Sequence, residues 1–297
     1  MQQQELKEKK IGYFYSITSA FIYALQVVVA KTILGEGIPP LDLLLIQYTT
    51  CTIILGLFLM TRRDRSLFYL KRENWKNIII QGIVGCALTS LLLYLAMQQI
   101  NAGIASMLLY LCPVYVCIFF VLTGIRKIGL ANKISVITAA VGAVLVLNLF
   151  GQEDMQLSVL GITLAALSGI TYAFYGLFAD LKLRKLPAEQ MLFYMYFVAT
   201  ILFWVLNPDI LVHPPQVENA AVWGRIVFLA LLQVMPMALL NLGIRAIGSN
   251  RATIIATAEL PFTLILAFFF LHETMSGIQI LGILMIIASI LILQIKK

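Results

Sequence analysis

Ten apolar runs, each close to 20 residues long, follow one another along this chain with short polar breaks between them. About 20 apolar residues form a helix that crosses the hydrocarbon core of a bilayer. Hydrophobic residues make up 61% of the sequence and charged residues 12%, whereas soluble domains are roughly half apolar and a quarter charged. We therefore predict an all-α polytopic membrane protein whose ten transmembrane helices lie near residues 11–33, 41–61, 76–97, 102–123, 131–149, 158–179, 188–206, 222–244, 251–271 and 275–295.

The basic residues are unevenly distributed between the predicted loops. With the N-terminus in the cytoplasm, every lysine and arginine except Lys31 and Arg225 falls on the cytoplasmic side. Cytoplasmic loops of membrane proteins carry such an excess. We therefore predict a multi-pass protein of the plasma membrane, of bacterial type, with both termini and the 62–75 loop in the cytoplasm and the 150–157 and 207–221 loops outside. The same asymmetry explains the net charge of +7, so the charge gives no reason to expect nucleic acid as a partner.

Two pairs of similar segments lie half a chain apart. The stretch SAFIYALQVVVAK at 19–31 resembles SGITYAFYGLFAD at 168–180, and residues 100–122 resemble residues 248–270. Five predicted helices separate the members of each pair, and because five is odd, the second copy enters the membrane from the opposite side. The prediction is therefore two inverted five-helix repeats, at 1–150 and 151–297, which are typical of secondary transporters.

The same features resemble a known family. Small residues precede the predicted fourth and ninth helices, Pro113 and Pro261 lie within these helices, and the C-terminal stretch reads FFFLHETMSGIQILGILMIIASILIL. In all of these the chain resembles the EamA-type transporters of the drug/metabolite transporter superfamily. His272-Glu273 stands where that family usually has Gly-Glu, and the corresponding first-half turn reads Gly124-Ile125-Arg126. The resemblance covers essentially the whole chain and implies a ten-helix carrier of small metabolites, often amino acids or related amphipathic compounds, which it commonly exports.

Polar side chains inside the predicted helices are candidates for a substrate path, because polar groups in hydrocarbon are costly unless they have partners. Helical spacing places a polar and aromatic face on the first helix and an equivalent face on the sixth. We expect these faces to approach each other across a central cavity, and hydrogen bonding between helices is the alternative. With further candidates on other helices, the predicted path residues are Ser19, Tyr23, Gln26, Tyr94, Tyr110, Ser168, Tyr172, Tyr175 and Gln233.

Glu259 is the only carboxylate that we predict to lie well inside the membrane. An acidic residue near the bilayer centre costs about 2.5–3.5 kcal/mol. Three roles could account for a carboxylate at this position: a place in the substrate path, coupling of transport to protons, or a contribution to helix packing. Two prolines, Pro113 and Pro261, are predicted to kink their helices, either for gating or as bends that packing tolerates.

Catalytic chemistry has little support in the sequence. Both histidines, His213 and His272, lie in predicted external turns, and no second carboxylate inside a predicted helix pairs with Glu259. We therefore predict no enzyme activity, no catalytic residues, no metal ligands and no cofactor. The predicted partners are a small-molecule substrate and the lipid bilayer, with protons an open possibility, and the sequence does not distinguish a monomer from a homodimer. The predicted function is a secondary transporter that exports a small metabolite by alternating access; the alternative is a small-solute channel or pore without ion coupling.

Overall fold

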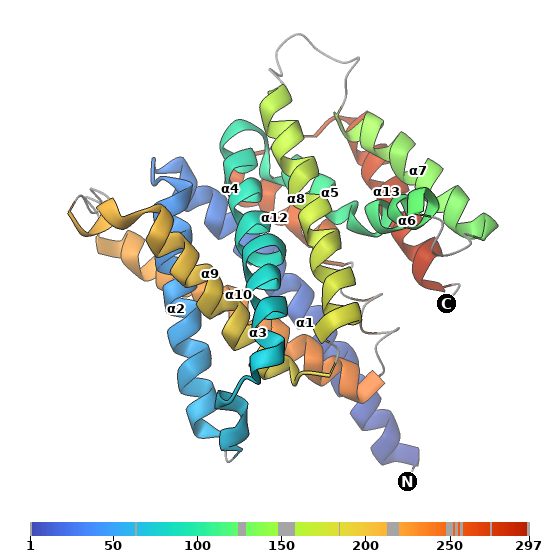
Figure 1. Cartoon of the computed structure of the whole chain (residues 1–297). Helices are drawn as coiled ribbons and strands as arrows, with labels where there is room; N and C mark the ends of the chain where they lie inside the picture. The colour runs from blue at the N-terminus through green and yellow to red at the C-terminus, as the bar shows by residue number, and fades with distance from the viewer. Residues whose placement is uncertain are drawn as a thin grey trace.

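The computed structural model describes residues 2–62, 64–123, 129–147, 158–183, 185–212, 220–247, 252, 255, 258–273 and 275–295 (Figure 1). All regular structure in these residues is helical. The described helices overlap the ten predicted ranges, but several extend beyond them: α1 begins at Gln2, α3 begins at Arg72, and the short 3₁₀ helices η1 Arg65–Phe68 and η4 Pro208–Leu211 lie in predicted loops. Their main bounds are α1 Gln2–Gly35, α2 Pro40–Thr61, α3 Arg72–Ile80, the π-helical η2 Gln81–Leu88, α4 Thr89–Gln99, α5 Ala102–Tyr110, α6 Cys112–Thr123, α7 Leu130–Leu147, α8 Val159–Phe178, η3 Ala179–Leu183, α9 Ala188–Leu206, α10 Ala220–Ile247, α12 Glu259–Leu271 and α13 Gly277–Ile295.

Six helices among the described residues are long and apolar enough to cross a membrane. They are Lys10–Gly35, Pro40–Thr61, Arg72–Gln99, Val159–Leu183, Ala188–Leu206 and Ala221–Leu240, and shorter apolar helices cover Ala102–Val116, Glu259–Leu271 and Gly277–Ser289. Large apolar side chains also cover outer faces of the molecule. Phe268, Phe269 and Phe270, for example, expose 54%, 66% and 63% of their surface. Contiguous exposed apolar surface of this kind is unusual in water, and it fits a polytopic membrane protein.

The helices of the two halves of the chain interleave. α1 packs along α10 and α12, whereas α8 packs along α4, η2 and α5. α2 packs against α9, and α7 against α13. The long contact of α1 with α10 and the grouping of α6, α7 and α13 can be followed in Figure 1. Each of these pairings joins one half to the other, and each recurs when the halves are exchanged.

Small residues allow two of these helix pairs to approach closely. A Cβ added at Gly12 on α1 would lie 2.7 Å from the Cβ of Ala246 on α10. A Cβ added at Gly161 on α8 would lie 2.7 Å from the Cβ of Gln99 on α4. Real Cβ atoms essentially never come so close, so a larger residue at either glycine would force the helices apart.

The two helix-central prolines lie at breaks rather than within continuous helices. α5 ends at Tyr110 and α6 begins at Cys112, so Pro113 is the second residue of α6. α12 begins at Glu259, which makes Pro261 its third residue. A proline is tolerated in the first turn because the amides there have no partner within the helix. The expected kinks are therefore helix starts in the described chain.

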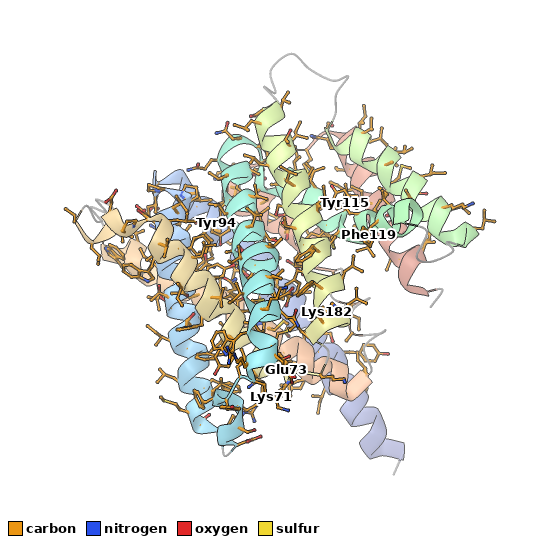
Figure 2. The ribbon with its side chains drawn as sticks, viewed as in Figure 1. Lys71, Glu73, Tyr94, Tyr115, Phe119 and Lys182 are labelled. Atoms are coloured by element: carbon orange, nitrogen blue, oxygen red, sulfur yellow. The ribbon has the colours of Figure 1, made fainter. Side chains whose placement is uncertain are left out.

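Several predicted features lie outside the described residues. These are the first-half turn at 124–128, the whole 150–157 loop, and residues 213–219 of the 207–221 loop. In the described part of the chain, Lys71, Glu73 and Lys182 lie at the same end of the molecule as the N-terminus (Figure 2). The segments that contain these residues are predicted to share the cytoplasmic side with the N-terminus.

Candidate functional site

A cavity of about 180 Å³ lies where helices of both halves meet. α1, α2, η2, α4 and α5 contribute to its wall from the N-terminal half, and α8, α9, α10 and α12 contribute from the C-terminal half. Six tyrosines line it, together with glutamines, hydroxyl groups and one carboxyl. The predicted path residues that the structure brings together here are Tyr23, Gln26, Tyr110, Tyr172, Tyr175, Gln233 and Glu259.

Glu259 lies in the cavity wall at the N-terminal end of α12 and is 9% exposed. Tyr110, the last residue of α5, lies in the same wall. The free backbone N–H groups at a helix start point out of its N-terminal end, so the start of α12 favours negative charge. We expected Glu259 eight residues into a helix, and its place at a helix start gives the carboxyl electrostatic support that the sequence did not indicate.

Tyrosine rings form much of the remaining wall. The rings of Tyr172 and Tyr175 on α8 are parallel, with their centroids 5.9 Å apart. Tyr48 and Tyr196 pair across the cavity wall at 5.2 Å, and the Tyr48 hydroxyl lies 2.6 Å from the Ser90 hydroxyl. The Tyr23 hydroxyl lies 3.6 Å from the sulfur of Met237. The cavity is therefore an aromatic chamber with a few polar groups, which is the usual composition of a small-molecule site.

A chain of polar side chains supports one wall. The hydroxyl of Tyr94, labelled in Figure 2, donates to Gln47 Oε1 at 2.9 Å, and Gln47 Nε2 donates to Gln233 Oε1. Gln26, on α1, also belongs to this polar group. Of these four residues, Gln26 and Gln233 face the cavity, whereas Tyr94 and Gln47 lie behind them. Tyr94 is therefore placed one layer away from the cavity that we expected it to line.

Two predicted path residues, Ser19 and Ser168, lie outside the cavity. The Ser19 hydroxyl donates to the Pro236 carbonyl at 2.8 Å, and the Ser168 hydroxyl donates to the Thr89 carbonyl at 2.9 Å. Both serines are buried. The first contact joins α1 to α10 and the second joins α8 to α4, so the serines serve the helix packing that was the alternative reading of these faces.

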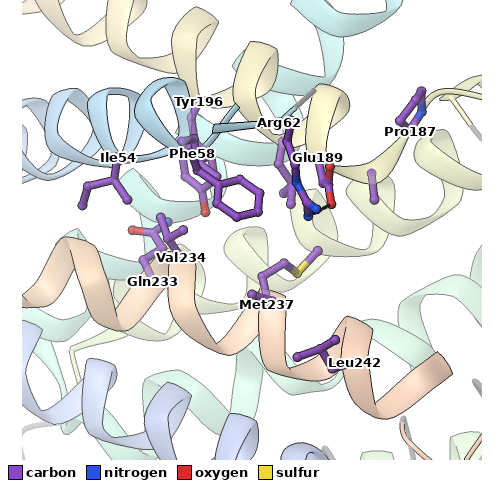
Figure 3. A pocket seen from close by; sticks show the side chains of 14 residues that line it. Ile54, Phe58, Arg62, Pro187, Glu189, Tyr196, Gln233, Val234, Met237 and Leu242 are labelled. Carbon is purple, nitrogen blue, oxygen red and sulfur yellow. Dashed lines mark hydrogen bonds and ion pairs between the residues drawn. The ribbon is translucent and has the colours of Figure 1, made fainter. Parts of the chain in front are cut away.

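A second, larger hollow of about 550 Å³ lies between α2, α9 and α10 (Figure 3). It shares four wall residues with the cavity: Leu192, Tyr196, Gln233 and Met237. The remaining wall is mostly apolar, and Arg62 and Glu189 form an ion pair of 2.6 Å at its edge, with Arg62 above the Phe58 ring at 4.7 Å. Leu192, Tyr196 and Met237 were missed in the sequence because apolar and aromatic positions on a helix look like ordinary core.

The turn between α4 and α5 is held from two sides by contacts that we call the clasp. Lys31 on α1 donates its ammonium group to the carbonyls of Met97 and Ile100, the latter at 3.0 Å. Glu273 accepts from the amides of Ala102 at 2.9 Å and Gly103 at 3.3 Å. A cation therefore meets the C-terminus of α4 and an anion meets the N-terminus of α5, as the helix dipoles favour.

The residue before Glu273 explains the glycine that the resemblance leads one to expect there. His272 ends α12 in the left-handed region with φ 55°, where glycine is favoured because it has no Cβ. The amides of His272 and Glu273 then both donate back to the Ala267 carbonyl, the latter at 3.3 Å. The turn thus directs Glu273 onto the start of α5.

Comparisons with known proteins agree with this architecture. The model of the EamA-like transporter family matches residues 10–148 and again residues 159–295. An uncharacterized transporter of Synechocystis sp. is 26% identical over 241 residues, which cover 78% of this chain and 72% of the relative. The pseudopaline exporter CntI of Pseudomonas aeruginosa is 21% identical over 296 residues, covering 97% of this chain and 98% of the exporter. A solved crystal structure with 16% identity superposes with a TM-score of 0.62, over 98% of this chain and 99% of that one.

Proposed function

Because the chain belongs to the EamA-like transporter family, we propose that it exports a small metabolite across the plasma membrane as a secondary transporter with alternating access. The proposed substrate is an amino acid or a similar amphipathic compound. The cavity carries this proposal, because its wall joins apolar rings to a carboxyl, amides and hydroxyls that both halves contribute. The name of the relative CntI, an exporter, supports the direction.

The architecture that we propose for this carrier is two inverted five-helix repeats, at 1–150 and 151–297, with ten transmembrane helices. The reciprocal pairings support it, since α1 packs on α10 and α12 as α8 packs on α4 and α5. Sites in the two contacts keep similar spacings: Gly12 and Gly161 are 149 residues apart, and their partners Ala246 and Gln99 are 147 apart. Secondary transporters built from such repeats place their substrate between the halves.

The proposed orientation has both termini in the cytoplasm. On a cysteine-free background, Glu36→Cys, next to the predicted external residue Lys31, should react with an impermeant maleimide in intact cells. Arg62→Cys should react only after the cells are broken open. The reverse pattern would refute the orientation.

Transport itself is tested with purified protein in liposomes. A carrier saturates with substrate and shows counterflow, whereas a channel conducts without counterflow. We expect saturable counterflow of at least one labelled amino acid or related amphipathic compound. Flux that rises linearly with concentration and shows no counterflow would favour the alternative, a small-solute pore without ion coupling.

Protons are the coupling ion that we propose for this carrier, with Glu259 as the group that binds them. The carboxyl is buried in the cavity wall, and protonation removes the desolvation cost of a buried charge. A pH gradient should therefore drive accumulation by the unaltered protein and not by Glu259→Gln. Accumulation that survives in this variant would exclude Glu259 as the coupling group.

A further inference from the structure

The charges around the cavity have one sign. Among the described residues of the cavity wall, Glu259 is the only acidic residue, and none is a lysine, an arginine or a histidine. The other polar groups are neutral tyrosine and serine or threonine hydroxyls, two amides and one thiol. The described ion pairs, Arg62 with Glu189 and Arg225 with Glu36, lie elsewhere. Within the part of the chain that the structure describes, an ionised Glu259 has no cationic partner.

The bonding capacity of the Glu259 carboxyl exceeds what the wall supplies. An ionised carboxylate has about four acceptor positions, and the described polar groups that share the wall with Glu259, such as the Tyr110 hydroxyl, are neutral. A buried charge is strongly disfavoured unless it is paired and hydrogen-bonded. A ligand with N–H donors and a positive charge would supply both at once.

The aromatic rings favour the same charge. Tyr23, Tyr110 and Tyr172 line the same cavity as Glu259. The face of an aromatic ring carries partial negative charge and attracts ammonium groups, most strongly where water is excluded. Rings and carboxyl therefore select for a cation, and a carboxylate on the ligand would meet a like charge at Glu259.

The shape of the cavity suits a small charged group joined to an apolar body. Its volume is about 180 Å³, and it shares four wall residues with the larger, mostly apolar hollow. We propose that the cavity binds small organic monocations, amines or quaternary ammonium compounds with a compact apolar body, with the cationic head between Glu259 and the rings of Tyr23 and Tyr172. This inference rests on the proposed transport function and, within the proposed class of amphipathic compounds, favours amines over amino acids.

Two matched sets of compounds test the charge preference on the full-length protein in detergent. The first set is phenethylamine, phenylalanine and 3-phenylpropionate, and the second is isopentylamine, leucine and 4-methylpentanoate. Each set keeps one apolar body and changes the charge from positive to zwitterionic to negative. Ligands that bind the folded state raise the unfolding temperature, so titration gives an affinity for each compound. We expect each amine to bind at least tenfold more tightly than its amino acid, and the acids to bind weakest.

Variants locate the binding groups. Glu259→Gln should weaken amine binding at least tenfold, whereas Glu36→Gln, which removes an exposed carboxylate that pairs with Arg225, should leave it unchanged. Tyr172→Phe keeps the ring and should bind amines nearly as the unaltered protein does, whereas Tyr172→Leu should lose affinity severalfold. Equal affinities within each compound set in the unaltered protein would overturn the inference even if every variant failed to fold.

Flux measurements separate this inference from the proposed function. The trimethylated form of phenethylamine is permanently charged, so lipid alone does not pass it. Its saturable counterflow in liposomes would support both proposals. Saturable flux of the amino acids or acids without flux of the cation would leave the transporter standing and overturn the cation inference. Cation binding without flux would support the inference and refute transport of these compounds. Absence of both binding and flux for all members of the two sets would overturn the inference.

Discussion

Removal of the Glu273 carboxylate should destabilise the protein although Glu273 lies outside the cavity. Glu273 accepts hydrogen bonds from the first two amides of α5, Ala102 N and Gly103 N. Loss of a side-chain acceptor at a helix N-terminus costs about 0.5–2 kcal/mol. Loss of a negative charge there costs about 0.3–1 kcal/mol more. We therefore expect Glu273→Ala to lower the free energy of unfolding by about 2 kcal/mol.

The isosteric variant separates the two contributions. Glu273→Gln keeps one oxygen that can accept from an α5 amide, but it loses the charge and presents an amide nitrogen to the second donor. The decrease in the free energy of unfolding should therefore be smaller in Glu273→Gln than in Glu273→Ala, about 1 kcal/mol. Because 1 kcal/mol shifts the unfolding temperature of a chain of 150–250 residues by about 2–4 °C, we expect Tm to fall by about 4 °C in Glu273→Ala and by about 2 °C in Glu273→Gln.

Thermal unfolding of the purified protein in one detergent measures these shifts. The matched control is Glu36→Ala, which removes a carboxylate from an exposed ion pair with Arg225 and should cost about 0–1 kcal/mol. If Glu273→Ala unfolds at the same temperature as Glu36→Ala, the carboxylate contributes no more than a surface charge, and capping of α5 by Glu273 is refuted.

Three further changes test local packing and backbone geometry by the same thermal assay. His272→Gly should stabilise the protein by about 0.5–1 kcal/mol, because glycine adopts the left-handed conformation at φ 55° without the steric cost of a Cβ. The greater freedom of glycine in the unfolded chain offsets part of this gain. A loss of stability would show that His272 is not strained at this position. Gly161→Ala should lower the free energy of unfolding by about 1–3 kcal/mol, because the added Cβ would collide with Gln99. Gly176→Ala has open space around the added Cβ and should stabilise its helix by about 0.5–1 kcal/mol. Equal effects of the two changes would contradict the close approach of α8 to α4 at Gly161. Ser168→Ala should lower the free energy of unfolding by about 1 kcal/mol, because it removes the donor to the Thr89 carbonyl. Unchanged stability would show that this hydrogen bond is dispensable.

The helix positions could be predicted from the sequence because bilayer thickness imposes one length on every apolar run. The long described helices overlap the predicted ranges, although α1 starts nine residues earlier than expected. The breaks could not be placed in the same way. Pro113 and Pro261 were expected inside helices, but the structure begins α6 and α12 just before them, since a proline is best accommodated in a first turn. Where a helix restarts depends on which neighbour accepts or supplies the free backbone groups, and apolar periodicity does not encode that neighbour.

The clasp illustrates the part of the structure that the sequence does not reveal. Glu273 and Ala102 are 171 residues apart in the chain, and no periodic pattern links them. Only the position of His272-Glu273, where the resemblance leads one to expect Gly-Glu, marked the turn. The structural role of this turn becomes clear from the positive φ of His272 and from the α5 amides, such as that of Gly103, that donate to Glu273. A short motif in a turn can therefore be structural even when it is the most recognisable part of the chain.

Polar side chains within the helices differ in function according to the partner that each one reaches. Ser19 and Tyr23 are one helical turn apart on the same face of α1, yet Ser19 bonds to the Pro236 carbonyl while Tyr23 lines the cavity. Ser168 and Tyr172 divide in the same way on α8. In both helices the small hydroxyl meets a backbone where the helices touch, and the large ring extends into the space where they separate. On α1 and α8, side-chain size therefore separates the member of the polar face that serves packing from the member that can contact a solute, because here only the long side chain extends from the close helix contact into the cavity.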